Sequence, residues 1–240
     1  FLELVTFRYR TIISDCLAKK LYLKKYQVLP LGGNMIPCGE KDFSEFRLMY
    51  VGTFDGRRLA DTIHGFKIFY ERHNKSLTCS YTIIGSGLEH EVKRVREAID
   101  KSGLQDVIAT PGYIPHDDLK EHFQDSNIGI SYVPITGFFN CQPPTKTYEY
   151  LLGGMAVLAT RTKENEHLIN EQNGVLIDDT AESIAEGLEQ LYQNRKRYRS
   201  AEIQRSMEPF VWENIVMNHL HAYLEEIYEK NSSEKSTKSS

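Results

Sequence analysis

Between residues 46 and 194, short apolar runs alternate with segments of helical periodicity, and this alternation constrains the fold more than any other feature. Strand-like runs stand at 48–51, 81–84 and 107–109, and again at 128–132, 156–159 and 175–177. The segment 88–101 places its apolar residues on one helical stripe and its charged residues on the other side. Repeated strand–helix–strand order with short connections predicts an α/β fold, with a parallel sheet covered by helices on both faces.

The segments on either side of this region have a different composition. Residues 14–26 read as an amphipathic helix with lysine pairs at 19–20 and 24–25, followed by a short strand and a polar linker. The lysine face is typical of a solvated helix, or of a surface that approaches anionic lipid headgroups. A last helix is predicted at 209–230, and the Ser, Lys and Glu of 231–240 predict a disordered tail.

Composition and charge exclude several classes of function. With 29 Lys and Arg against 33 Asp and Glu, the net charge of −4 disfavours a nucleic-acid partner. No apolar run approaches the roughly 18–20 residues of a membrane span, and the start does not resemble a signal peptide. The four cysteines are far apart without a C-x-x-C pair, which predicts neither a zinc site nor a disulfide framework and suggests a reducing, cytosolic compartment.

Ligands of parallel sheets bind where the strands end at the carboxyl edge, so the loops after the strands are expected to hold any binding site. After the first strand, Gly52 and Thr53 precede Arg57; this turn suits a diphosphate, although such turns also serve ordinary chain reversal. After the second strand, residues 85–87 read Gly-Ser-Gly and can expose backbone N–H groups. They lack the GxGxxG pattern and the acidic residue after the next strand, which argues against an NAD enzyme.

The third strand leads into a loop that contains Tyr113, Ile114 and His116. Prolines on both sides hold this segment extended, so its backbone could read the edge of a flat heterocycle, while Tyr113 could equally be a packing residue. His116, followed by Asp117, is typical of a helix start rather than of a catalytic group.

The stretch 134–160 is the most informative part of the sequence. A long loop enters a helix with Pro144 in its first turn, where the helix dipole attracts anions. Lys146 has the wrong sign for that position unless an anion binds there. Glu149 follows on the same face, either as the partner of Lys146 in an intrahelical pair or as an acceptor of hydrogen bonds from sugar hydroxyls.

Taken in order, these motifs resemble the nucleotide-sugar-binding half of GT-B glycosyltransferases, most closely the retaining family 4, also called group 1. The matching pieces are Val51-Gly52-Thr53 with Arg57, then 85–87, then Gly-Tyr-Ile-Pro at 112–115, and the helix 144–150 ahead of the strand 156–159. The resemblance implies a Rossmann-like donor domain at 44–208, with 1–43 as a remnant of the acceptor domain plus linker and 209–230 as a crossover helix. The acceptor-binding half would precede Phe1.

The resemblance also assigns roles to residues. The turn Gly52, Thr53 and the side chains of Arg57 and Lys146 would bind the diphosphate; Tyr113 and Ile114 would bind the base; Glu149 would bind the ribose; Gly137, Phe138, Phe139 and Asn140 would face the donor sugar. The sequence departs from the family at Thr53, where an Arg is usual, and at Cys141, eight positions before Glu149, where the family often has a Glu. No catalytic residue is assigned.

The implied chemistry is retaining sugar transfer from a nucleotide-diphosphate sugar to a polysaccharide or lipid-linked acceptor, without a metal or cofactor. The implied setting is the cytoplasm, at the inner face of a membrane, and the chain alone would bind donor with weak or no turnover. Two alternatives stay open: a sugar-nucleotide epimerase of GT-B architecture, which needs acid/base carboxylates and a His at the cleft, and a non-catalytic nucleotide-binding subunit that works with a partner chain.

Overall fold

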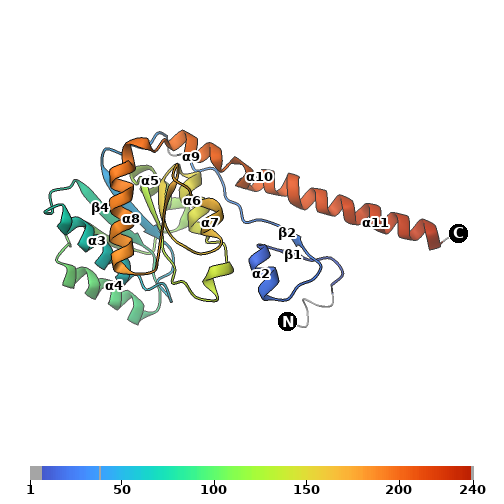
Figure 1. Cartoon of the computed structure of the whole chain (residues 1–240), viewed down its shortest axis with the longest axis horizontal. Helices are drawn as coiled ribbons and strands as arrows, with labels where there is room; N and C mark the ends of the chain where they lie inside the picture. The colour runs from blue at the N-terminus through green and yellow to red at the C-terminus, as the bar shows by residue number, and fades with distance from the viewer. Residues whose placement is uncertain (1–6, 38, 239–240) are drawn as a thin grey trace.

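The main body of the protein is a six-stranded parallel sheet (Figure 1). The structure, a computed structural model, describes residues 7–37 and 39–238. The sheet has the order β5-β4-β3-β6-β7-β8, and every neighbouring pair is parallel. Its strands are β3 (Phe46–Val51), β4 (Cys79–Ile84), β5 (Ile108–Gly112), β6 (Ile128–Ser131), β7 (Ala156–Thr160) and β8 (Gly174–Ile177). The predicted α/β class and parallel sheet are confirmed.

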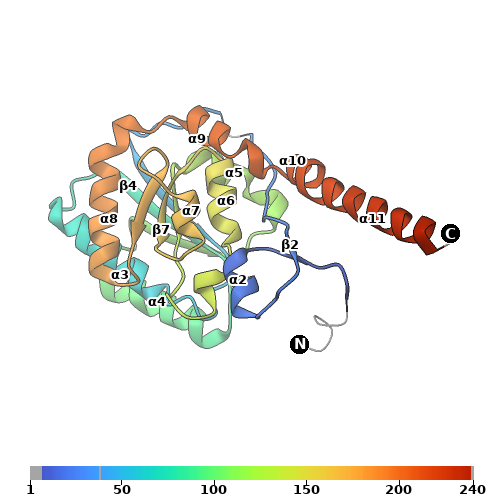
Figure 2. The same ribbon diagram turned by 45° about the vertical axis from the view of Figure 1, so that its right-hand side comes forward.

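Helices flank this sheet in two groups (Figure 2). In one group α3 (Ala60–Arg72) contacts both α4 (Glu89–Ser102) and α8 (Ala181–Asn194). In the other, α6 (Thr145–Leu152) contacts β6, β7 and α9 (Ser200–Ser206), while α5 (Lys120–Asp125) contacts β3. Shorter helices complete the connections: η1 (His116–Leu119), η2 (Phe139–Cys141), α7 (Asn165–Leu168), η3 (Arg195–Arg197) and η4 (Glu208–Phe210).

The strand order places the reversal of chain direction between β3 and β6. From β3 the chain adds β4 and β5 on one side and, after crossing back, β6, β7 and β8 on the other. The loops that follow β3 and β6 therefore diverge and leave a crevice at the carboxyl edge of the sheet. All residues of β6 and β7 are buried, as expected for central strands covered on both faces.

A buried tyrosine joins the two halves of the sheet at this crevice. Tyr150 of α6 packs so closely on Gly129 of β6 that a Cβ at position 129 would overlap its ring. Its hydroxyl accepts a hydrogen bond of 2.9 Å from the backbone N–H of Val51, at the end of β3. Helix α6 is thereby held next to the end of β3.

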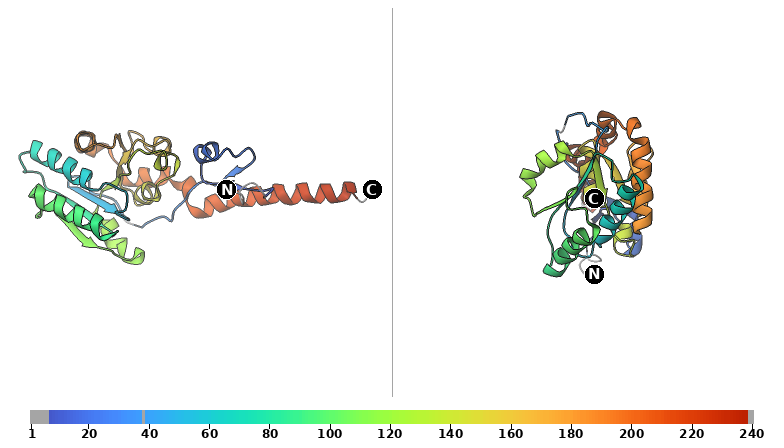
Figure 3. Two further views of the ribbon diagram at one scale, coloured as in Figure 1. Left: turned by 90° about the horizontal axis from the view of Figure 1, so that it is seen from below. Right: turned by 90° about the vertical axis from the view of Figure 1, so that its left-hand side faces the viewer.

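The N-terminal segment forms a small unit beside the C-terminal helix (Figures 1 and 3). It contains β1 (Thr11–Ile12), α2 (Asp15–Lys20) and β2 (Gln27–Val28), with the two strands parallel. The C-terminal part runs through α10 (Trp212–Ile215), a π-helical stretch η5 (Val216–His221) and α11 (Ala222–Lys238), and projects away from the sheet. The hydroxyl of Tyr223 accepts a hydrogen bond from the N–H of Arg10, which ties the two segments together.

Two expectations for the flanking segments are wrong. The helix predicted at 14–26 ends at Lys20, because Tyr22 takes a positive φ of 55° and the N–H of Leu23 bonds back to the carbonyl of Ala18. This is the Schellman motif, here without the glycine that is usual at the residue with positive φ. The tail predicted to be disordered at 231–240 continues α11 as far as Lys238, since helix propagation adds one bond per residue once a long helix exists.

Within residues 7–37 and 39–238, no helix has both the length and the apolar character needed to cross a membrane. Cys38 and residues 1–6 and 239–240, which the sequence arguments also used, lie outside the described residues.

Candidate functional site

Three turns, one after each of β3, β4 and β5, line a single pocket of about 450 Å³ at the carboxyl edge of the sheet. Gly52 and Thr53 come from the first turn, residues 85–87 from the second, and Tyr113 and Ile114 from the third. The side chain of Tyr113 is 71% exposed, so the interpretation of this residue as a packing plug is wrong. The structure thus brings together four of the sequence-predicted site residues.

The first two turns approach each other so closely that only glycine fits. Gly52 and Gly85 have φ values of +145° and +142°, which L side chains rarely adopt. A Cβ at Gly85 would overlap the carbonyl oxygen of Gly52, and the N–H of Gly52 donates to the carbonyl of Ile84 at 3.0 Å. The glycines are therefore required by the contact between turns, and they also leave backbone exposed to the pocket.

Lys146 reaches across the crevice from the first turn of α6 to the turn after β3. A Cβ placed on Gly52 would lie 2.5 Å from its Cε and Nζ, and Nζ lies 5.2 Å from the centre of the Tyr50 ring. Burial, and next the nearby charge of Arg57, lower the pKa of Lys146 to about 8, while Glu149 opposes the shift. Burial therefore makes the charged form of Lys146 unfavourable. Such an environment is typical of a cation that binds an anion.

Arg57 supplies the second cation of the crevice. Its guanidinium lies 4.3 Å from the centre of the Phe139 ring, and its Nε is buried without a hydrogen-bond partner. Arg57, Phe139 and Lys146 line a cavity of about 70 Å³ together with Pro144 and neighbours. A buried donor left unsatisfied costs free energy that an oxygen-rich ligand would recover.

Glu149 lies one turn after Lys146 on α6 and is half-buried. Burial raises the pKa of its carboxyl above the ordinary value, and the nearby charges of His116 and Lys146 act in the opposite direction. The sequence arguments gave His116 a capping role, and the structure places it in the short helix η1, near Glu149.

The loop expected to face the donor sugar, Gly137 to Asn140, is divided between two cavities. Phe139 lines the small cavity with Arg57, and Phe138 is 66% exposed. Gly137 and Asn140 line a separate cavity of about 810 Å³ between the sheet domain and the N-terminal unit. None of the four residues lines the pocket formed by the three turns.

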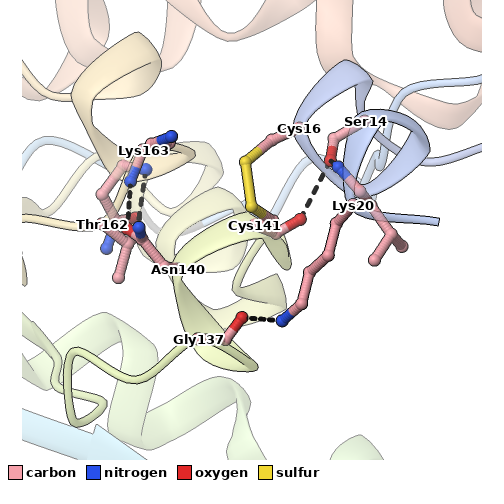
Figure 4. Close-up of a disulfide and its surroundings, with 10 residues drawn as sticks. Ser14, Cys16, Lys20, Gly137, Asn140, Cys141, Thr162 and Lys163 are labelled. Carbon is pink, nitrogen blue, oxygen red and sulfur yellow. Dashed lines mark hydrogen bonds between the residues drawn. A yellow bond between two sulfur atoms is a disulfide. The ribbon is translucent and has the colours of Figure 1, made fainter. Parts of the chain in front are cut away.

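A disulfide joins Cys16 of α2 to Cys141 at the end of this loop (Figure 4). The Oγ of Ser14 also donates a hydrogen bond of 2.9 Å to the carbonyl of Cys141, and the ammonium of Lys20 donates to the carbonyl of Gly137. The expectation that the cysteines form no disulfide is wrong on this structure. The two cysteines are 125 residues apart in sequence and meet only because the N-terminal unit docks on the loop.

An ion-pair cluster beside the crevice was not predicted from the sequence. Arg58 forms ion pairs with Asp61 at 2.6 Å and with Asp179 at 3.1 Å. Asp179 also accepts a hydrogen bond of 3.1 Å from the N–H of Ile135, and the buried Tyr132 donates to Asp61 at 2.9 Å. The cluster fixes the loop after β3 to the loop after β6. The only hint in the sequence was the acidic pair after the last strand.

A buried polar network fixes the start of α6. The hydroxyls of Ser131 and Thr147 are 2.7 Å apart, and Thr147 donates to the Oδ1 of Asn165 at 2.8 Å. Asn165 in turn donates to the carbonyl of Thr160 at 2.8 Å. Because all three side chains are buried, the network defines where the first turn of α6, and hence Lys146, begins.

No cluster of three or more His, Cys, Asp or Glu side chains that could hold a metal ion occurs among the residues that the structure describes. The crevice instead presents two cations, a half-buried carboxyl and exposed backbone. Such a site suits a ligand with a phosphate-type anion at one end and hydroxyls or a flat ring at the other.

Fold and site together define a GT-B-type α/β protein with a Rossmann-like parallel sheet. The family model "Glycosyl transferases group 1" matches residues 45–194, and the chain belongs to this family. A sequence search found no curated protein with a significant match.

Solved structures share this fold at low sequence identity. The pneumococcal O-GlcNAc transferase GtfA, in complex with UDP and GlcNAc, has a TM-score of 0.73 and 16% identity, over 93% of this chain and 46% of that one. Anabaena Alr3699/HepE, in complex with UDP and glucose, has a TM-score of 0.68 and 14% identity, over 93% of this chain and 62% of that one. The lipopolysaccharide outer core galactosyltransferase WaaB, in its apo form, has a TM-score of 0.70 and 17% identity, over 92% and 62%. The chain therefore spans roughly half to three-fifths of these structures.

Proposed function

We propose that this chain is the donor-binding part of a retaining glycosyltransferase, which takes a nucleotide-diphosphate sugar and transfers the sugar to a glycan or lipid-linked acceptor. The observation that carries the proposal is the meeting of Lys146 with Gly52. Lys146 is on α6, which follows β6 in the chain. Its ammonium group lies at the edge of the 450 Å³ pocket formed by the turns after β3, β4 and β5. A cation at the rim of a pocket with exposed backbone suits a nucleotide whose phosphates leave the pocket at that point.

The assigned roles follow the geometry of the crevice. The base would lie against Tyr113 and Ile114 in the pocket of the three turns, and the ribose hydroxyls would bond to the Glu149 carboxyl. The diphosphate would then lie between Lys146 and Arg57, whose unpartnered Nε provides a donor. The donor sugar would face residues Gly137 to Asn140, of which Phe139 lines the same cavity as Arg57.

The chemistry that these residues supply is stabilisation of the leaving diphosphate. As the bond between sugar and phosphate breaks, negative charge grows on the diphosphate oxygens. Lys146 and Arg57 both line the cavity proposed for the diphosphate, so their positive charges can stabilise the negative charge that grows there. We expect this step to proceed without a metal ion. We further propose a cytoplasmic setting in which the exposed Lys19 and neighbouring lysines approach a membrane surface.

Thermal stabilisation by nucleotides tests the proposal. UDP, GDP, ADP and TDP, with and without EDTA, are added to the chain while unfolding is followed by fluorescence; UDP comes first because two similar structures hold it. At a hundredfold excess over Kd a ligand adds about 2.7 kcal/mol, which corresponds to a shift of several degrees. We expect one nucleotide to shift the melting temperature, with or without EDTA.

Two variants make the test specific to the site. Lys146→Ala and Glu149→Ala should lose the shift, whereas the matched control Lys120→Ala, an exposed lysine of α5 outside the crevice, should keep it. A shift that survives in Lys146→Ala, or that requires a divalent metal, would contradict the assigned site. If no nucleotide shifts the protein, this chain does not hold the donor.

A further inference from the structure

The Cys16–Cys141 disulfide lies in a cavity rather than in a packed core. Both cysteines line the 810 Å³ space between the N-terminal unit and the sheet domain. Cys16 is half-buried and Cys141 is buried, so Cys16 is the more exposed residue of the two. Their Cα atoms are 5.1 Å apart, which lies within the range found for protein disulfides.

The charges around this cavity favour a particular kind of reactant. Lys19, Lys20 and Lys163 line it, together with His167, against the carboxyls of Asp15 and Glu164. Burial raises the pKa of the Glu164 carboxyl. Positively charged walls favour the approach of an anionic small-molecule thiol such as glutathione, whose thiolate is the attacking species in disulfide exchange.

The disulfide restrains the loop that covers Arg57. Cys141 is the last residue of η2, and Phe139, two residues earlier, lies on the Arg57 guanidinium. On the same side of the loop, Ser14 bonds to the carbonyl of Cys141 and Lys20 to that of Gly137; on the other side, Asn140 accepts from the N–H of Lys163 at 3.0 Å (Figure 4). The covalent bond is the strongest of these restraints.

The restrained loop limits the space for a diphosphate. The cavity bounded by Arg57, Phe139 and Lys146 measures about 70 Å³, far less than the 450 Å³ of the neighbouring nucleotide pocket. Because Phe139 lines this small cavity, we expect its ring to move when a phosphate enters to bond to the Arg57 Nε. If Phe139 moves, the backbone between it and Cys141 must move as well, and the disulfide restrains Cys141.

We propose that Cys16–Cys141 is a thiol-exchange site that regulates access of the donor diphosphate, a proposal that rests on the donor-binding function above. A thiolate attacks the Cys16 sulfur, the disulfide bond breaks, and Cys141 leaves as a thiolate that takes up a proton. A second thiol then attacks the mixed disulfide, releasing the Cys16 thiol and the oxidised small-molecule disulfide. Two thiols thus supply the two electrons, and the loop 137–141 is freed from α2.

The first measurement maps the exchange site without reference to nucleotide. The chain is incubated with reduced glutathione or with glutathione disulfide, free thiols are alkylated, and peptides are identified by mass spectrometry. Cys16 and Cys141 should be alkylated only after reduction. Cys79 is half-buried in β4, where burial raises the pKa of its thiol to about 11; it should react slowly and equally in both samples. Alkylation of Cys16 and Cys141 in both samples would overturn the proposal.

The second measurement compares two ligands by calorimetry in both redox states. UDP reaches Arg57 and uridine does not, so reduction should lower the Kd of UDP by about tenfold and leave that of uridine unchanged. Cys16→Ser and Cys141→Ser should bind UDP like the reduced protein in either state. Cys79→Ser and Cys38→Ser should retain the response; melting temperatures of all variants establish that they are folded.

The outcomes separate this proposal from the donor-binding function. Equal UDP affinity in the two states, with the disulfide mapped as expected, would overturn the regulatory role while the donor site stands. Equal changes for UDP and uridine would also overturn it, because the effect would then not act at the diphosphate. If neither ligand binds in either state, the donor-binding function fails and the regulation fails with it, whereas the alkylation map still decides whether exchange occurs.

Discussion

Replacing Lys146 by methionine should make the unliganded protein more stable and remove its response to nucleotide. The lysine pKa falls from 10.5 to about 8 in the folded chain. Since one pKa unit corresponds to about 1.4 kcal/mol, keeping the ammonium charged at pH 7 costs at most on the order of 3 kcal/mol. Methionine keeps most of the packing and removes the charge. The melting temperature of Lys146→Met should therefore rise by up to about 10 °C.

The sign of the pH dependence follows from the same shift. Below pH 8 the lysine is protonated in both the folded and the unfolded chain, and the folded state bears the full penalty. Between about 8 and 10.5 the unfolded chain binds more protons, so the free energy of unfolding rises with pH; above this range the penalty is gone. Urea denaturation at pH 7, 8.5 and 10 measures this rise, and the difference between wild type and Lys146→Met isolates it from the tyrosines.

Lys120→Met is the matched control, because it removes a positive charge from an exposed position of α5. It should change the melting temperature by little at any of these pH values and should keep the nucleotide response. If Lys146→Met is less stable than wild type at pH 7, the ammonium has a favourable partner in the unliganded protein. The idea that the site holds an unpaired, desolvated cation would then be refuted.

Three further substitutions test the elements that build the site. Gly52→Ala places a Cβ 2.5 Å from the Lys146 Nζ, at a residue with a φ of +145°. It should destabilise the protein by about 1–3 kcal/mol and abolish the shift in melting temperature on nucleotide binding. The control Gly56→Ala, at a φ of +65° with open space around it, should keep that shift. Asp179→Ala removes one of the two carboxylate partners of Arg58 and the side-chain acceptor of the Ile135 N–H, so hydrogen exchange should speed up in 132–139 and donor affinity should fall several-fold, with a small change in melting temperature. Thr147→Val leaves Ser131 and Asn165 without their partner and should cost about 1–3 kcal/mol in urea denaturation, whereas Thr145→Val, exposed on the same helix, should cost little.

The sheet could be predicted because its strands are buried on both faces. A run such as 156–159 is apolar at every position, and its neighbours carry helical periodicity, so local pattern and tertiary role agree. The turns after the strands could be predicted for a similar reason. Glycine at positions 52 and 85 is required by backbone geometry, and the sequence displays that requirement directly.

The remaining features depend on contacts between distant segments. The pairing of Cys16 with Cys141 requires the docking of α2 on the loop, which residue spacing does not encode. The Arg58–Asp179 pair likewise joins positions 121 residues apart, and each residue alone looks like a solvated surface charge. The early end of α2 at Lys20 depends on Tyr22 adopting a positive φ. The presence of a tyrosine does not predict this conformation.

The two cations of the crevice belong to opposite halves of the sheet, and this division gives the site its electrostatic character. Arg57 follows β3, and Lys146 follows β6, so the strand order alone brings two positive charges together. Burial, and next the charge of Arg57, lower the pKa of Lys146. A diphosphate between them would reverse the sign of that interaction, and its binding would therefore raise the lysine pKa and take up protons above pH 8. The repulsion present without ligand becomes part of the driving force for holding the leaving group.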